Sequence, residues 1–222
     1  MISKVKFSIL AVVVILAIGI FILSNNNPKN QITNEEDQET IASVNGQSIT
    51  AADIARTQKA ALLTGKVEIT EAQALERTIG ERLMLQEAER LELTLTTPEA
   101  EDHLSKYLTI SGKTLDNVKE ALSESEENYA AEMEVYRQQV TINRLLTEKT
   151  PLPEITDEEV QEYYELNKDK MFPAEGLVAS YDQIAPQLKQ AIAQQRRQEE
   201  ITTFVNSLRE NAEIVYLNQA EN

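Results

Sequence analysis

Residues 41–54 read IASVNGQSITAADI, and this stretch decides how the fold begins. Ile41–Val44 is typical of a short strand, Asn45-Gly46 favours a tight turn, and Thr50 followed by Asp53 predicts the capped start of a helix. On this interpretation the stretch supplies one strand only. Because unpaired backbone groups are costly to bury, we expect the partner of this strand to lie far along the chain.

The expected partner is the segment AEIVYLN, residues 212–218, near the end of the chain. Ile214, Val215 and Tyr216 are residue types that favour strands. We therefore predict that Ile41–Val44 pairs with Glu213–Leu217. Such a two-stranded pairing brings the two ends of the folded part together.

The residues between these strands predict a mainly α fold. Several hydroxyl residues precede an acid or amide by three positions, as in Thr70 with Gln73, and Thr97-Pro98 indicates another helix start. Pro151 and Pro153 mark a linker between the early helices and the last two. The expected helices are 51–64, 71–91, 98–109, 115–123, 126–148, 157–170 and 181–211.

The N-terminus contains an uncharged, apolar run of 17 residues, from Phe7 to Leu23. A helix of that length rises about 25 Å, which is just enough to cross a bilayer. No small-residue cleavage site follows the run, so an uncleaved anchor is favoured over a cleaved signal peptide. Lys4 and Lys6 precede the run, and the positive-inside rule then predicts a single-pass membrane protein with a cytoplasmic N-terminus and the remainder outside.

These patterns predict five segments along the chain. Residues 1–24 form a membrane anchor or uncleaved signal, and residues 25–40 form a flexible linker. Residues 41–150 form the first part of a helical domain, residues 151–179 a connecting helix and short loop, and residues 180–218 a helix and strand that complete the domain.

The composition excludes several functional classes. The chain has 21 Lys and Arg against 37 Asp and Glu, for a net charge of −16, which argues against nucleic acid as a partner. The absence of cysteine excludes disulfides, thiol nucleophiles and cysteine-bound metals. No glycine-rich phosphate loop or nucleophile elbow is present, so neither a cofactor nor a catalytic residue is predicted.

Two long stretches resemble a known family. IASVNGQSITAADI and the following ALERTIGERLMLQEAERLELTLTTPEAEDHL are similar to the N-terminal chaperone domain of SurA- and PrsA-type foldases. The distal ITDEEVQEYYELNKDKMF and SYDQIAPQLKQAIAQQRRQEEITTFVNSLRENAEIVY resemble the same domain. One departure is Glu92, where the family commonly has glycine.

The resemblance implies a foldase without its catalytic insert. A parvulin-type prolyl isomerase domain commonly lies between the two distal stretches, whereas this chain has only Pro173–Ala179, seven residues that cannot form such a domain. The parvulin active site resembles a cluster of histidines and polar groups, and this chain has one histidine, His103. We therefore expect that the protein is not an enzyme.

Candidate binding residues are aromatic and methionine side chains, which offer adaptable apolar surface. At helical spacing such side chains are more often part of a core than of a binding surface. His103 and the acidic runs 35–39 and 124–127 are interpreted as solvated positions without the spacing of a metal site. The candidates for client binding are Tyr129, Met133, Tyr136, Tyr163, Tyr164, Met171 and Phe172.

The leading hypothesis is a membrane-anchored, extracytoplasmic chaperone that holds unfolded segments of exported proteins in an apolar cleft without ATP. The first alternative is a membrane-anchored adaptor or assembly factor with one dedicated protein partner. The second is a residual peptidyl-prolyl isomerase, which rests on the family alone. The sequence leaves open whether the protein forms homo-oligomers.

Overall fold

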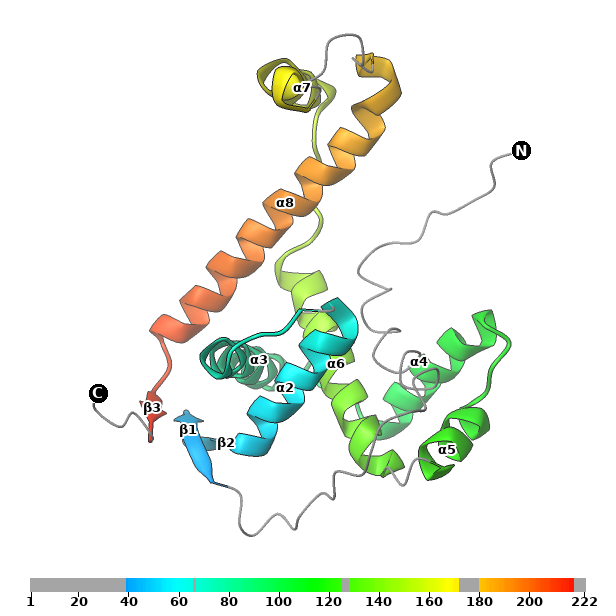
Figure 1. The fold of residues 1–222 in the computed structure, drawn as a ribbon, viewed down its shortest axis with the longest axis vertical. Helices are drawn as coiled ribbons and strands as arrows, with labels where there is room; N and C mark the ends of the chain where they lie inside the picture. Colours follow the sequence, from blue (N-terminus) through cyan, green and yellow to red (C-terminus); the bar gives the residue numbers. More distant parts are fainter. Residues whose placement is uncertain (1–38, 66, 125–127, 172–179, 218–222) are drawn as a thin grey trace. The chain divides into compact units, whose positions relative to one another are not determined.

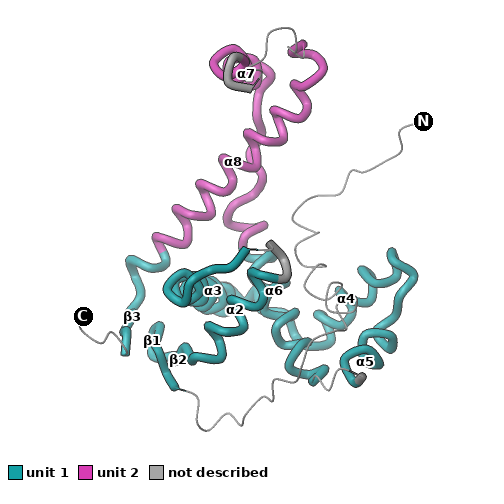
Figure 2. Tube along the Cα trace, viewed as in Figure 1, with its two compact units in different colours: residues 1–145, 208–222 teal, residues 146–207 magenta. Residues whose placement is uncertain are grey.

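The computed structural model describes residues 39–65, 67–124, 128–171 and 180–217. The chain divides into two compact units, with residues 1–145 and 208–222 in unit 1 and residues 146–207 in unit 2 (Figure 2). The predicted anchor and nearly all of the predicted linker, residues 1–38, lie outside the described residues. Among the described helices, none is both long enough and apolar enough to span a bilayer.

Unit 1 contains a small antiparallel sheet of three strands in the order β2-β1-β3 (Figure 1). Strand β1 spans Thr40–Val44, β2 spans Gln47–Thr50 and β3 spans Ile214–Tyr216. The predicted pairing of the chain ends is confirmed, because Ala42 lies opposite Tyr216 and Val44 lies opposite Ile214.

The predicted two-stranded sheet is corrected by the presence of β2. Asn45 and Gly46 have φ angles of 49° and 80°, so both occupy the left-handed region that a tight two-residue hairpin requires. The chain therefore reverses directly, and Gln47 pairs with Val44 before the helix begins. The first partner of β1 is thus adjacent in the sequence, and the distant β3 is its second partner.

The sheet packs against helices α2 (Ala51–Gly65) and α3 (Glu71–Arg90). Alternate strand residues point inward, so Ala42, Val44 and Ile49 are fully buried. Helix α2 begins at the predicted Thr50 cap, whose hydroxyl accepts from the Asp53 N–H, and Thr57 and Thr78 share a buried hydrogen bond of 2.8 Å between the two helices. We call the following cluster the sheet core: Ala42, Val44, Ile49, Ile54, Ala74, Ile79 and Leu83, with Ile69, Leu75, Leu208, Ala212 and Ile214 packed against it.

A second cluster in unit 1 joins α4 (Thr97–Ile110), α5 (Leu115–Glu124) and α6 (Tyr129–Lys149). Thr96, rather than the predicted Thr97, caps α4, because its hydroxyl accepts from the Glu99 N–H while the Glu99 carboxylate accepts from the Thr96 N–H. We call the following cluster the lobe core: Leu95, Ala100, Leu104, Leu108, Val118, Leu122, Met133, Tyr136 and Val140.

Helices α3 and α4 end in the same backbone arrangement with different residues. Glu92 follows α3 with a φ of 58°, and Gly112 follows α4 with a φ of 69°. In both, the next residue donates to the carbonyl of the last turn, as Leu93 does to Ala88 and Lys113 does to Leu108. The turn therefore forms at Glu92 although the family commonly has glycine there.

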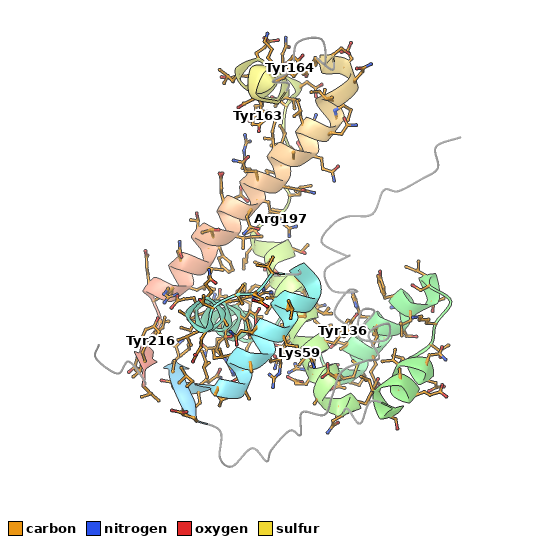
Figure 3. All side chains as sticks on the ribbon, viewed as in Figure 1. Lys59, Tyr136, Tyr163, Tyr164, Arg197 and Tyr216 are labelled. Carbon is orange, nitrogen blue, oxygen red and sulfur yellow. The ribbon has the colours of Figure 1, made fainter. Side chains whose placement is uncertain are left out.

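Unit 2 contains the linker after α6, helix α7 (Asp157–Met171) and most of α8 (Tyr181–Glu210). Its core consists of Ile155, Val160, Tyr164, Leu188 and Ala193. The polar middle of α8 is anchored within the unit, since Arg196 donates to Glu159 at 2.9 Å and Arg197 donates to the Thr150 carbonyl at 2.8 Å (Figure 3). Polar residues here bind backbone and carboxylate groups rather than only facing solvent.

Candidate functional site

The three candidate binding residues on α6 contribute to the lobe core. Met133 and Tyr136 are 4% and 6% exposed, and Tyr129 is half-buried at the start of the helix. The Asn128 side chain caps this end by accepting from the Ala130 N–H at 2.9 Å. These side chains therefore offer little surface to a ligand in this state, and a role in client binding stays a prediction that would require the lobe core to open.

Hydrogen bonds fix both tyrosines of this set. The Tyr136 hydroxyl lies 2.7 Å from Nδ1 of His103, and burial raises the pKa of Tyr136 to about 12 (Figure 3). The Tyr129 hydroxyl donates to Glu101 at 2.9 Å, and burial together with this carboxylate raises the pKa of Tyr129 to about 12. His103 is exposed, as predicted, but its imidazole joins α4 to α6.

The two tyrosines among the candidate residues of unit 2 differ in exposure. Tyr164 is buried and packs edge-on against Tyr181, with ring centroids 5.7 Å apart, whereas Tyr163 on α7 is 36% exposed. Leu166, three residues along the same helix, is 72% exposed. Phe172 and the side chain of Met171 lie outside the described residues. Of the two described tyrosines of this group, Tyr163 is the one whose ring is exposed to a ligand.

A polar cleft of about 550 Å³ lies in unit 1, at the C-terminal half of α3. Gln86 reaches from α3 to the hairpin, where it donates to the Val44 carbonyl at 3.1 Å and accepts from the Asn45 amide at 2.7 Å. Arg137 of α6 also lines the cleft, and it donates to Glu134 and to the Leu95 carbonyl. The lining residues are Gln47, Arg82, Leu85, Gln86, Glu89, Glu92, Thr94, Arg137 and Gln138.

This cleft is not the apolar cleft between the helical groups that the sequence led us to expect, and that cleft stays a prediction. Leu85 is the one aliphatic side chain in a wall of amides, guanidinium groups and carboxylates. Such a wall can form hydrogen bonds to a polar ligand, and the carbon atoms of its long side chains and of Leu85 add apolar surface between the polar groups. These lining residues were not predicted, because the hairpin that brings Gln47 beside α3 was not predicted. The Asn45-Gly46 pair is the signal that could have revealed it.

Three polar side chains fix the last strand of the sheet, and we call Glu76, Arg209 and Tyr216 the latch. The Arg209 guanidinium, at the end of α8, binds the Glu76 carboxylate of α3 and donates to the Tyr216 hydroxyl at 2.7 Å. The Tyr216 hydroxyl donates in turn to Glu76 at 3.1 Å. The hydrogen bond from Arg209 holds the pKa of Glu76 below its ordinary value, so the carboxylate of the latch is ionised at neutral pH.

These features define a helical domain whose sheet joins its first and last strands, and whose exposed large apolar side chains include Tyr163 and Leu166 on α7 and three successive residues at β3, Val215, Tyr216 and Leu217. Residues 1–112 match the family described as the SurA-like N-terminal domain. Since this match covers half of the chain, the protein belongs to that family. A search of curated proteins gives no match.

The fold is also similar to a solved structure from Campylobacter jejuni. That structure comes from work on the virulence factor PEB4 and the periplasmic protein Cj1289, two structurally related SurA-like chaperones. The similarity has a TM-score of 0.61 at 16% sequence identity, and it covers 81% of this chain and 99% of the other. At this identity the likeness establishes the fold.

Proposed function

We propose that this protein is an ATP-independent chaperone that holds unfolded segments of exported proteins outside the cytoplasm. The observation that carries the proposal is the SurA-like domain, supported by the family match over residues 1–112 and by a chaperone fold that covers 81% of the chain. Within that fold, exposed apolar side chains such as Tyr163 and Leu166 provide surface for weak contact with unfolded chains.

In this proposal the protein is anchored in the membrane by its N-terminus. The apolar run from Phe7 to Leu23 would anchor it, and Lys4 and Lys6 would keep the N-terminus in the cytoplasm. About sixteen residues of tether before β1 would reach roughly 20 Å on average as a flexible chain. Such a tether would keep the folded part close to segments that emerge from the membrane.

No catalytic step is part of the proposal. Only nine residues, 172–180, separate α7 from α8, and so short a segment cannot form a parvulin domain. The imidazole of His103 is hydrogen-bonded to the Tyr136 hydroxyl, an arrangement that fits a structural role.

The test uses the full chain in lipid nanodiscs and an unfolded model protein whose aggregation is followed by light scattering. We expect stoichiometric amounts to slow aggregation without ATP, and empty nanodiscs provide the blank. Lack of any effect on several unrelated unfolded proteins would contradict the proposal. A proline-peptide isomerisation assay on the same sample is expected to show no acceleration.

The adaptor hypothesis makes a different prediction in cells. Crosslinking of a general chaperone should give many exported proteins, each at low yield, whereas an adaptor should give one dominant product. A single product at high yield would therefore favour the adaptor.

A further inference from the structure

Strand β3 presents backbone groups along the edge of the sheet that pair with no other described residue. The Leu217 N–H donates to the Ile41 carbonyl at 2.8 Å, and the Asn45 N–H donates to the Glu213 carbonyl at 2.8 Å. Antiparallel bonding alternates along a strand, so Val215 also faces β1, whereas the backbone groups of Ile214 and Tyr216 point away from it. Neither outward N–H is bonded to another residue in the described part of the chain.

The opposite edge of the sheet, strand β2, is partly occupied. The Thr50 N–H donates to the Asp53 carboxylate at 3.0 Å, and α2 begins at the next residue. The exposed residues of this strand, Gln47 and Ser48, are polar. The hairpin edge is therefore closed at one end by a helix cap, and β3 is the more open of the two edges.

The side chains of β3 also lack the usual protection of an edge strand. Val215, Tyr216 and Leu217 are 40%, 36% and 54% exposed. Edge strands in soluble proteins commonly carry lysine, proline or a bulge that prevents further pairing, and residues 214–217 contain neither a charge nor a proline. Val215 and Leu217 point to the same face, where Ile41 lies opposite Leu217.

This edge is held in place before any ligand arrives. Within the latch, Glu76 and Arg209 bind the Tyr216 hydroxyl, and the Asn45 side chain accepts from the Glu213 N–H at 2.8 Å. A preformed strand loses little conformational entropy when it pairs with a further strand. The edge is therefore suited to capturing an extended chain.

We propose that the β3 edge binds an extended, unfolded polypeptide segment as an added strand of the sheet. Main-chain hydrogen bonds to Ile214 and Tyr216 would hold segments of many sequences, and Val215 with Leu217 would favour apolar residues at alternate positions. The inference rests on the proposed chaperone function and names the surface that a client contacts.

The size and charge of the edge favour an unfolded segment over a folded partner or a second copy of the chain. A stable interface with a folded partner or a second copy uses about 20–30 residues on each side, whereas β3 has three. A short edge suits a segment that binds weakly and leaves. Glu210 and Glu213 lie beside the strand in a chain of net charge −16, so segments with lysine or arginine next to their apolar residues are favoured.

The first experiment measures amide hydrogen exchange on the full chain in nanodiscs. The probe is a soluble peptide of about ten residues that alternates threonine and valine between lysine pairs, long enough to span the strand. We expect exchange to slow at Ile214 and Tyr216 and to stay unchanged at Val215, which is already bonded to β1. An analogue with methylated backbone nitrogens at alternate positions keeps the side chains and should give no protection.

The second experiment uses a matched pair of variants. Val215→Lys places a charge on the edge, and Val135→Lys makes the same change at a site on α6 that is 38% exposed. We expect Val215→Lys to lower peptide affinity about tenfold, measured by fluorescence anisotropy, because lysine opposes pairing at an edge. Val135→Lys should stay within about twofold of the parent protein, because it leaves the edge unchanged.

The outcomes separate this inference from the proposed function. If the peptide binds but Ile214 and Tyr216 gain no protection, the edge is not the site, whatever Val215→Lys does. The two variants could also match each other in peptide affinity and in suppression of aggregation. The edge inference would then be wrong, while the chaperone function would stand. If the parent protein binds neither peptide nor unfolded protein, both are wrong.

Discussion

The sheet core and the lobe core belong to the same unit but are assembled from different parts of the chain. The lobe core draws on residues 95–140, whereas the sheet core joins residues 42–83 to residues 208–214. In the lobe core, three neighbouring helices and Leu95, just before the first of them, supply the whole cluster. In the sheet core, Ile214 must reach Val44 across 170 residues of sequence.

This difference implies different cooperativity. Closing a long loop costs conformational entropy before any contact is formed, although the cost grows slowly with length. The sheet core can form fully only after the last strand has returned, whereas the lobe core can form from local contacts alone. We therefore expect changes at the C-terminus to weaken one core and spare the other, and the following predictions test this.

The largest effect is expected from truncation after Asn211, which removes β3. Loss of the β1–β3 hydrogen bonds and of the Ile214 packing should destabilise the sheet core by about 3–5 kcal/mol. Amide exchange should accelerate at Ser43, which pairs with Val215, and at Asn45, whose acceptor is the Glu213 carbonyl, and it should stay slow at Val140 in the lobe core. Equal acceleration in both cores would show that they unfold as one unit.

Alkaline pH should act on the lobe core through Tyr136. Burial raises the pKa of this hydroxyl to about 12, so its contribution is complete below the unfolded value near pH 10 and is lost as the pH rises towards 12. Between pH 9 and pH 11.5 the loss should be about 2 kcal/mol.

The measurement for Tyr136 is chemical denaturation at both pH values for the parent protein and for Tyr136→Phe. The variant lacks the ionisable hydroxyl, so its stability should fall less over this interval. Identical pH dependence in the two proteins would contradict the assignment. The pKa values of Tyr129 and Tyr216 are also raised, but both residues are present in the parent protein and in the variant. The difference between the two proteins therefore reports the ionisation of Tyr136 alone.

The helix ends of the two cores should respond in opposite directions. Glu92→Gly, at the end of α3, should stabilise the protein by about 1 kcal/mol because glycine adopts a positive φ without strain. Gly112→Ala, at the end of α4, should destabilise it by about 1 kcal/mol. A Cβ at Gly112 meets no atom within 4 Å, so the effect is conformational, and thermal unfolding of both variants measures it.

The smallest effect is expected from the latch at acidic pH. Arg209 lowers the pKa of Glu76, so this stabilisation is complete above the ordinary glutamate pKa of about 4.3 and is lost as the pH falls through the lowered value. Because both side chains are partly exposed, we expect less than about 1 kcal/mol. Glu76→Gln should flatten the acid dependence of exchange at Ser43, while that at Val140 should not change.

Local sequence signals predicted the helices well. The seven predicted helices agree with the observed bounds to within about three residues, because capping residues and prolines act over a few positions. The cap of α4 was predicted one residue too late. Thr96 and Thr97 offer the same hydroxyl, and only Thr96 lies three residues before Glu99, whose carboxylate completes the cap.

The candidate binding residues were harder to predict. Met133 and Tyr136 show the same helical spacing whether they bind a client or fill a core, so the pattern could not decide between the two. Packing decided it for this state, since α4 and α5 cover both side chains. The open edge of β3 left no mark in the sequence beyond three apolar residues near the chain end.

The sequence by itself determined the helices and the strand at each end of the folded part, because capping, turn chemistry and strand propensity are short-range properties. The pairing of those two strands followed from a different argument, the cost of leaving a lone strand unpaired. The third strand was signalled locally as well, because the Asn45-Gly46 pair is typical of a hairpin. Only the tertiary structure decided that residues of β2, α3 and α6 line one cleft and which aromatic side chains are covered. Those features depend on which helix and strand surfaces pack together, and helical spacing and capping do not specify that.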